Sequence, residues 1–228
     1  MTVQMPNGIY VFGGVGVTSK MTYEYLPRDS KVWQTIPYFQ GDIVSPLIGL
    51  SREDARTGIQ HGSGHRVSNE ELILIKYQHM VRFNVMNTSW YAIPLRVGRW
   101  DAASIILNNM LIICGGCFKQ NGLSVGFTEI VDLTTNQSRM GGNLNVARAG
   151  FGMALIVVRN KLRLLAFGGI HKEKEVVTTI HNKFIDSVEI WDEVTESWIM
   201  TDMKLQQKRR AFGYVSVSSR DFPHFVKE

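Results

Sequence analysis

The chain has 228 residues, of which 44% are hydrophobic, 10% aromatic and 20% charged, and its formal net charge is +5. This is a globular composition, which excludes a largely disordered, collagen-like or coiled-coil chain, and the few scattered basic clusters do not indicate nucleic-acid binding. No apolar run approaches the ~20 residues that span a bilayer and the N-terminus has no secretory-signal pattern, so we expect a cytoplasmic protein without a membrane partner.

Short apolar runs follow one another along the chain. They are rich in β-branched residues and are bounded by Gly, Asn, Asp, Lys or Arg, which is typical of buried strands. In chain order they are residues 9–12, 72–75, 105–107, 111–113, 155–158 and 162–167. Only residues 70–71 and 204–210 have helical character, and both stretches are too short to build a helical layer. The sequence therefore predicts a nearly all-β protein.

Three of these runs end in the same dipeptide, which indicates an internal repeat. The pairs are Gly13-Gly14, Gly115-Gly116 and Gly168-Gly169. The first interval is about twice the second, so a repeat of roughly 50 residues fits, with a degenerate copy at ELILIKYQ (71–78) that lacks the glycines.

Two further signatures recur in the same order. An aromatic residue stands seven positions before a tryptophan or, in the first copy, eight positions before it; the pairs are Phe83 and Trp90, Trp191 and Trp198, and Tyr25 and Trp33. The third copy keeps the spacing at Val131 and Ser138 without aromatic residues. An arginine precedes the apolar strand of each copy, at Arg99, Arg148 and Arg210, with a weaker match at Arg56.

This combination of arginine, apolar strand, Gly-Gly and spaced aromatic residues resembles the Kelch repeat over nearly the whole chain. The resemblance implies a β-propeller of four-stranded blades, in one domain with repeats at about 1–40, 50–97, 98–142 and 147–203 and an extra strand at 209–219. It gives the motif residues a structural role, with the large rings wedged between blades. These residues are Gly13, Gly14, Tyr25, Trp33, Phe83, Trp90, Gly115, Gly116, Arg148, Gly168, Gly169, Trp191 and Trp198.

The two ends of the chain allow two interpretations of how the propeller ring is completed. Only eight residues precede Ile9, so we expect the first blade to lack an innermost strand of its own. The segment RAFGYVSVS (210–218) could supply that strand, with residues 212–217 hydrogen-bonded to residues 9–12 in a closed four-bladed ring. Alternatively the chain belongs to a longer ring. Because Kelch propellers usually have more blades, we favour an incomplete or irregular ring.

Three motifs that suggest chemistry have simpler explanations. Cys114 and Cys117 have the spacing of a redox motif or of half a zinc site, but they flank a repeat Gly-Gly and no second pair exists. The pair His61 and His65 is separated by glycines, which favours a loop over a helical metal site. Gly13-Gly-Val-Gly16 lacks the residues of a phosphate-binding loop. We expect no catalytic residue, metal or cofactor.

Loop length is the remaining distinctive feature. Residues 170–185 form the longest predicted loop and residues 117–126 a moderate one, and binding residues concentrate on such loops. In Kelch proteins the loops on one face of the ring usually take partner peptides. The resemblance therefore implies partner-binding candidates at Phe118, Lys119, His171, Lys172, Lys174, His181 and Phe184. A solvated, unstructured loop is the alternative.

The expected function follows from this resemblance. We expect a non-enzymatic protein-interaction module that presents loops to a protein or peptide partner. Substrate recognition for a cullin-type ubiquitin ligase and binding to actin or other cytoskeletal proteins are the roles that the family implies. The alternative is an enzyme or a sugar-type small-molecule binder that uses the channel mouth, and this would need convergent titratable residues there.

Overall fold

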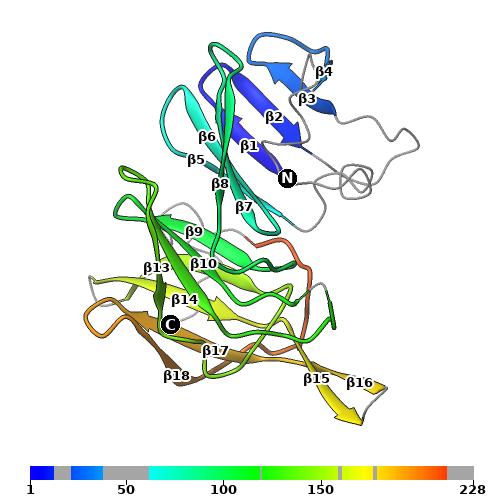
Figure 1. Ribbon diagram of the computed structural model, residues 1–228, viewed down its shortest axis with the longest axis vertical. Helices are drawn as coiled ribbons and strands as arrows, with labels where there is room; N and C mark the ends of the chain where they lie inside the picture. The colour runs from blue at the N-terminus through cyan, green and yellow to red at the C-terminus, as the bar shows by residue number, and fades with distance from the viewer. Residues whose placement is uncertain (13–21, 38–61, 119, 159–160, 177–178, 215–228) are drawn as a thin grey trace, which may run out of the picture. The chain divides into compact units, whose positions relative to one another are not determined.

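The computed structural model describes residues 1–12, 22–37, 62–118, 120–158, 161–176 and 179–214. These residues form an all-β fold of four-stranded antiparallel sheets without helices (Figure 1), so the predicted fold class is confirmed at this level. Accordingly, no helix in the described ranges is long and apolar enough to cross a membrane. The chain divides into two compact units, one formed by Met1–Trp100 with Asp132–Ser138 and the other by Asp101–Val131 with Arg139–Glu228.

The first unit contains two sheets, each a simple antiparallel meander in chain order. The strands of the first sheet are β1 (Thr2–Met5), β2 (Gly8–Phe12), β3 (Thr22–Pro27) and β4 (Gln34–Pro37). Those of the second are β5 (Ser63–Arg66), β6 (Glu71–Lys76), β7 (His79–Asn84) and β8 (Trp90–Pro94).

The two sheets of this unit share one core built largely from aromatic rings. Burial alternates along β2, so that Tyr10 and Phe12 are buried while Ile9 and Val11 are only half-buried. The ring of Phe12 meets the ring of Phe83 edge-on at 6.2 Å between centroids, and Phe83 stacks on Trp90 at 3.9 Å. Strand alternation therefore directs the large rings of both sheets to the same side, where they stabilise the unit.

The second unit contains the other two sheets and an additional hairpin. The third sheet has the order β9 (Ala103–Leu107), β10 (Met110–Cys114), β11 (Thr128–Asp132) and β12 (Ser138–Gly141). The fourth has the order β13 (Gly152–Val158), β14 (Lys161–Phe167), β17 (Ser187–Asp192) and β18 (Ser197–Lys204). The hairpin of β15 (Ile170–Val176) and β16 (Thr179–Phe184) is inserted between β14 and β17.

The core of the second unit joins residues of both sheets. Ile112 and Ile130 of the third sheet lie in the same buried cluster as Met153, Trp191 and Trp198 of the fourth. Leu164 and Ala166 of β14 complete the fourth sheet's inner face. Neither sheet could bury this surface alone, which is the physical reason for pairing four-stranded sheets.

The Gly-Gly pairs of the second unit end strands with one repeated geometry. Gly115 and Gly168 have φ values of +61° and +69°, and Gly116 and Gly169 have values of +99° and +96°. A Cβ on Gly169 would lie 2.7 Å from the Cβ of Phe151, so only glycine fits there. Gly13 and Gly14 lie outside the described residues.

Each of these turns is bound by the start of the following repeat. The N–H of Gly116 donates to the carbonyl of Arg148, and the N–H of Gly169 donates to that of Arg209, both at 2.8 Å. The structure therefore aligns Arg209 with Arg148, where the sequence pattern had suggested Arg210.

The expectations for the chain ends require correction. The first sheet has its own first strand, because β1 pairs with β2 after a turn at Pro6-Asn7. Ile9 of β2 is opposite Gln4 on one side and Leu26 on the other, so neither edge of β2 can accept residues 212–217. Residues 209–214 form no strand, since the backbone of Arg209 and Ala211 bonds instead to Gly169 and Gly150; residues 215–219 lie outside the described part.

His65 also differs from its predicted loop setting, since it lies within β5 opposite Ile73. The Gly residues around Ser63 exclude a helix but not a strand. Burial lowers the pKa of His65 to about 4, which keeps the imidazole neutral in the folded protein. His61 lies outside the described residues.

We predict that His65 makes stability sensitive to mild acid. Its pKa is about 4 in the fold and about 6.5 in the unfolded chain, so its contribution is complete above pH 6.5 and is lost as pH falls toward 4. The loss should be at most about 3 kcal/mol. Urea unfolding between pH 4 and 8 should show a shallower acid decline for His65→Gln than for the unsubstituted chain. Parallel curves for the two proteins would refute this.

Candidate functional site

The segment predicted as the longest loop is in fact a β-hairpin. β15 and β16 pair antiparallel, with His171 opposite Lys183, Lys172 opposite Asn182 and Glu173 opposite His181. The unstructured-loop alternative is therefore wrong for the described residues of this segment. Val176, Thr179 and Ile180 account for the difference, because β-branched residues favour extended backbone. In Figure 1 the hairpin extends away from the fourth sheet.

The two segments that the sequence nominated for binding do meet. Ser124, in the 117–126 loop, receives a hydrogen bond at its hydroxyl from the N–H of Lys172 and donates its own N–H to the Lys172 carbonyl. The Ser124 hydroxyl also donates to the carbonyl of Ile170 at 3.1 Å. This loop thus borders the base of β15 and fixes it, and we call the loop and the hairpin together the hairpin surface.

The candidate residues contribute to the hairpin surface to different degrees. Phe118 is half-buried, with its ring 6.1 Å from that of Phe127. Lys174 and His181 are exposed, and Phe184 is 43% exposed with the guanidinium of Arg210 lying 5.9 Å from its ring centroid. Lys119 lies outside the described residues.

The pairing register divides the hairpin into two faces, because residues opposite one another point to the same side. One face carries His171, Glu173, His181 and Lys183. The other carries Lys172, Lys174, Asn182 and Phe184. The sequences of β15 and β16 contain three lysines and two glutamates, Glu173 and Glu175, so the hairpin has a small net positive charge.

A main-chain carbonyl group fixes the orientation of the His171 imidazole. Its Nδ1 lies 2.7 Å from the carbonyl oxygen of Ala147, and its Nε2 lies 3.3 Å from Oε2 of Glu173. A carbonyl oxygen only accepts hydrogen bonds, so Nδ1 carries the proton and donates it.

The two cysteines are buried thiols. Cys114 ends β10 with its sulfur 3.4 Å from the Thr128 hydroxyl, and burial raises the pKa of Cys117. A redox or nucleophilic thiol needs access and a lowered pKa, so this environment favours a packing role. As the side chains stand, no three His, Cys, Asp or Glu residues of the described ranges are grouped closely enough to hold a metal ion.

Arg148 has a partner that the sequence analysis did not identify. Its guanidinium bonds to the Glu189 carboxylate at 2.7 Å and to the carbonyls of Gly168 and Ser187, and both charged side chains are fully buried. Aligning the repeats would have shown the signal, because YEYLP, TEIVD and VEIWD place Glu24, Glu129 and Glu189 at the same strand position.

The aromatic spacing has a simple geometric cause. Residues seven apart are directly opposite in the hairpins, as Phe83 is to Trp90 and Trp191 is to Trp198. At a spacing of eight, Tyr25 is instead opposite Gln34 and Trp33 lies before β4, 45% exposed. The wedge role expected for Trp33 is therefore wrong.

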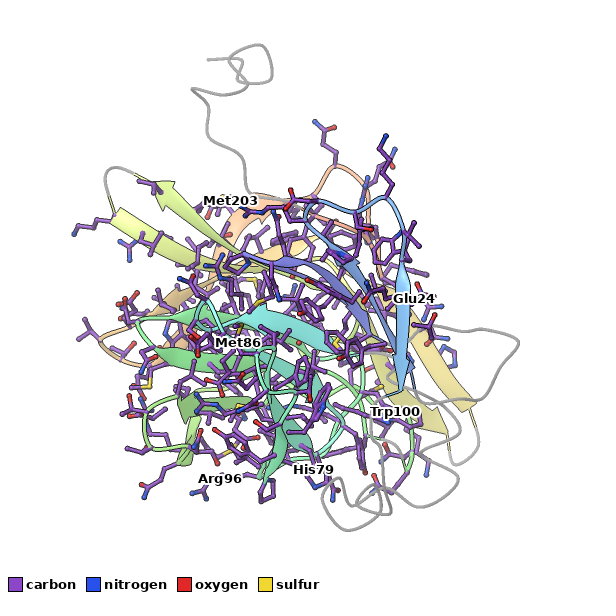
Figure 2. The ribbon with its side chains drawn as sticks, turned by 90° about the horizontal axis from the view of Figure 1, so that it is seen from above. Glu24, His79, Met86, Arg96, Trp100 and Met203 are labelled. Carbon is purple, nitrogen blue, oxygen red and sulfur yellow. The ribbon has the colours of Figure 1, made fainter. Side chains whose placement is uncertain are left out.

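These hairpins have the turns that the sequence indicates before the tryptophan positions, at Thr88-Ser89, Asn136 and Thr195-Glu196, and the turns share one hydrogen-bonding pattern. Asn84, Asp132 and Asp192 each accept two backbone N–H groups from residues two and three positions ahead. Four positions ahead, Thr88, Asn136 and Glu196 have positive φ. The same hydrogen bonds lower the pKa of Asp132 and Asp192. The turn between β7 and β8 also leaves Met86 exposed (Figure 2).

These features define a class of protein: an all-β chain of repeated four-stranded antiparallel sheets, with a hairpin added to the last. No family model and no curated protein matches the chain. Among solved structures it is similar to the one described as "Structure of YjhT", with a TM-score of 0.71 and 13% identity over 92% of this chain and 71% of that one. At this identity the likeness supports the fold alone.

Proposed function

We propose that this chain is a non-enzymatic protein-interaction module of the Kelch propeller type, and that the hairpin surface binds its partner. The observation that carries the proposal is the contact of Ser124 with β15, which holds an exposed, basic hairpin on a packed sheet. Binding sites are commonly projecting segments that a rigid scaffold positions.

Repeated geometry supports the Kelch propeller type. The Gly-Gly turns after β10 and β14 have matching φ values and make matching hydrogen bonds to Arg148 and Arg209. In the hairpins β7–β8, β11–β12 and β17–β18, the connecting turn begins at an Asn or Asp whose side chain accepts backbone N–H groups of the turn. Such repetition at several independent points is what consecutive blades of a propeller require.

The charge of the hairpin defines the partner that it would suit. Lys172, Lys174 and Lys183 favour an acidic segment of another protein, and the exposed ring of Phe184 offers apolar contact area beside them. Recognition of substrates for a cullin-type ubiquitin ligase and binding to actin are the two uses that the Kelch resemblance implies.

We predict that reversing charge on the hairpin abolishes partner capture. The double variant Lys174→Glu/Lys183→Glu removes two exposed lysines, and its matched control Lys161→Glu/Lys204→Glu changes two exposed strand lysines elsewhere in the same unit. Affinity capture from cell extract with quantitative mass spectrometry, in the presence of a chelator, should lose specific partners with the hairpin variant alone. If both variants retain the same partners, the hairpin is not the binding surface.

A further inference from the structure

We propose that the outer face of the fourth sheet, the face turned away from the third sheet, docks onto the first sheet of a second copy of this chain, with Arg209 pairing with Glu24 across the contact. The inference goes beyond the proposed function, because it concerns self-association and not the hairpin surface. It is based on the backbone around Arg209, on the apolar row of the fourth sheet, and on the exposed glutamate of the first sheet.

The backbone around Arg209 repeats that around the two preceding repeat arginines. Two residues after each arginine lies a residue with positive φ: Asp101 at +54°, Gly150 at +57° and Ala211 at +49°. The N–H of Gly150 donates to the carbonyl of Asp101, and the N–H of Ala211 donates to that of Gly150. Residues other than glycine rarely adopt such φ values, so the shared conformation indicates one repeated local structure. Arg209 therefore stands at the start of a further repeat.

The side chain of Arg209 begins in the same way as that of Arg148 in the repeat before. In both arginines, Nε donates to the carbonyl two residues back along the chain. The Arg148 guanidinium then reaches the buried Glu189 carboxylate in the sheet that follows it. Arg209 is exposed, and its guanidinium donates to the Gln207 side chain at 3.3 Å. The repeat therefore predicts that Arg209 pairs with a glutamate of a following sheet.

The outer face of the fourth sheet carries an apolar row across all four strands. The pairing register aligns Ala154, Leu165, Ile190 and Ile199 from β13 to β18. Ile199 is 50% exposed and Ile190 is half-buried. In the third sheet, Ile112 and Ile130 have the corresponding positions, counted from the Gly-Gly pair and from the strand glutamate. They are each 3% exposed because the fourth sheet covers them. The row thus has the character of a face that another sheet covers.

The first sheet offers the complementary surface. Its aromatic residues are buried against the second sheet, so Ile9 and Val11 point to the other side, where both are half-buried. Glu24 lies opposite Val11 and is exposed (Figure 2). Glu129 and Glu189 have the same strand position in the third and fourth sheets, and both are fully buried. An exposed glutamate therefore stands where the other two repeats bury theirs.

Charge and packing together identify the occupant as a second copy. The row on the fourth sheet fits an apolar sheet that carries a glutamate for Arg209, and the first sheet has both features. Glu24 and Ile199 are exposed in the chain itself, so both surfaces can accept a second copy. Such a head-to-tail contact is heterologous, and two copies joined at both surfaces can close into a ring. Four four-stranded sheets of described residues from each copy give eight, which is within the range of known propellers.

Sedimentation velocity of the purified, tag-free full chain tests the contact. We expect a dimer, and we expect Arg209→Glu and Glu24→Arg each to weaken association by about thirtyfold or more, the usual effect of disrupting a buried charge pair in an interface. Ile199→Asp should also weaken association, because it places a charge in the apolar row. Arg66→Glu and Glu70→Arg make the same charge reversals on exposed residues of β5 and of the segment that follows it, and they should leave association unchanged.

Mixing the two charge variants tests the pairing directly. An equimolar mixture of Arg209→Glu and Glu24→Arg should associate, because one contact of the mixed dimer has the two charges exchanged and the other keeps the native pair. Recovery would also show that both variants are folded. A monomeric unsubstituted chain, association that neither reversal weakens, or no recovery in the mixture would overturn the proposal. Since no partner protein is present, failure here leaves the partner-binding proposal untouched, and the reverse also holds.

Discussion

Replacing Glu189 with glutamine should lower the free energy of unfolding by about 3–5 kcal/mol, the usual cost of breaking a buried ion pair. The substitution keeps the size of the side chain but leaves the Arg148 guanidinium buried without its counter-charge. Burial already lowers the pKa of Arg148, which shows how unfavourable its surroundings would be for an isolated charge.

The effect should be large because the glutamate satisfies several groups at once. One carboxylate oxygen accepts from Arg148 and from the N–H of Val146. The other accepts from the N–H and the side-chain amide of Asn145. Glutamine can replace only some of these acceptors, so desolvated donors in the 145–148 segment would lose their partners.

Two controls separate charge from packing. Glu193→Gln makes the same chemical change on an exposed residue four positions along the chain, and it should alter stability by less than about 0.5 kcal/mol. The double variant Arg148→Met/Glu189→Leu removes both charges and should be less destabilised than the sum of the single changes. Urea unfolding measures all of these differences, and equal losses for Glu189→Gln and Glu193→Gln would show that the buried pair is not a stabilising contact.

The strands that were predicted correctly are those in which the residue types of the segment itself are enough to indicate a buried strand. Residues 72–75 and 111–113 are uninterrupted branched or aliphatic runs, and both lie inside buried strands, β6 and β10. Such runs can be satisfied only by burial on both faces. For residues 111–113, the Gly-Gly pair that follows also marks the end of the strand.

The first strand escaped prediction because its signal is weak. β1 consists of Thr2–Met5 and carries only two buried side chains, Val3 and Met5, in strict alternation. Four residues are too few to establish a period-two pattern from sequence. It forms because its neighbour β2 offers a free edge and a core for those two side chains, which is information that exists only in three dimensions.

The candidate site was only partly predictable for a related reason. Composition and length indicated the segments around Phe118 and His171, and Ser124 does bring these segments together. The pairing of Glu173 with His181 depends on the register of a hairpin whose sequence, residues 170–184, has no Gly or Pro to mark the centre. Sequence patterns indicate which side chains are present, whereas the register decides which of them share a face.

Replacing Trp198 with alanine should also destabilise the protein by about 3–5 kcal/mol, as expected when a fully packed aromatic side chain is removed. Trp198 is 4% exposed and lies opposite Trp191, with 5.3 Å between the ring centroids. Its Nε1–H donates to the Thr128 hydroxyl at 2.9 Å, which links β18 to β11. Removal would leave a cavity, and the buried Thr128 hydroxyl would keep only the weaker contact with the Cys114 sulfur.

The chain provides its own matched control for this substitution. Trp33 occupies the corresponding motif position but is 45% exposed, so Trp33→Ala should cost less than about 1 kcal/mol. Trp198→Phe should fall between, because it keeps most of the apolar area and loses only the hydrogen bond. Denaturant unfolding gives the loss of unfolding free energy for each of the three variants. Similar losses for Trp198→Ala and Trp33→Ala would mean that the two motif tryptophans stabilise the protein equally. A much larger loss for Trp198→Ala assigns the effect to burial, which the seven-residue spacing allows and the eight-residue spacing does not.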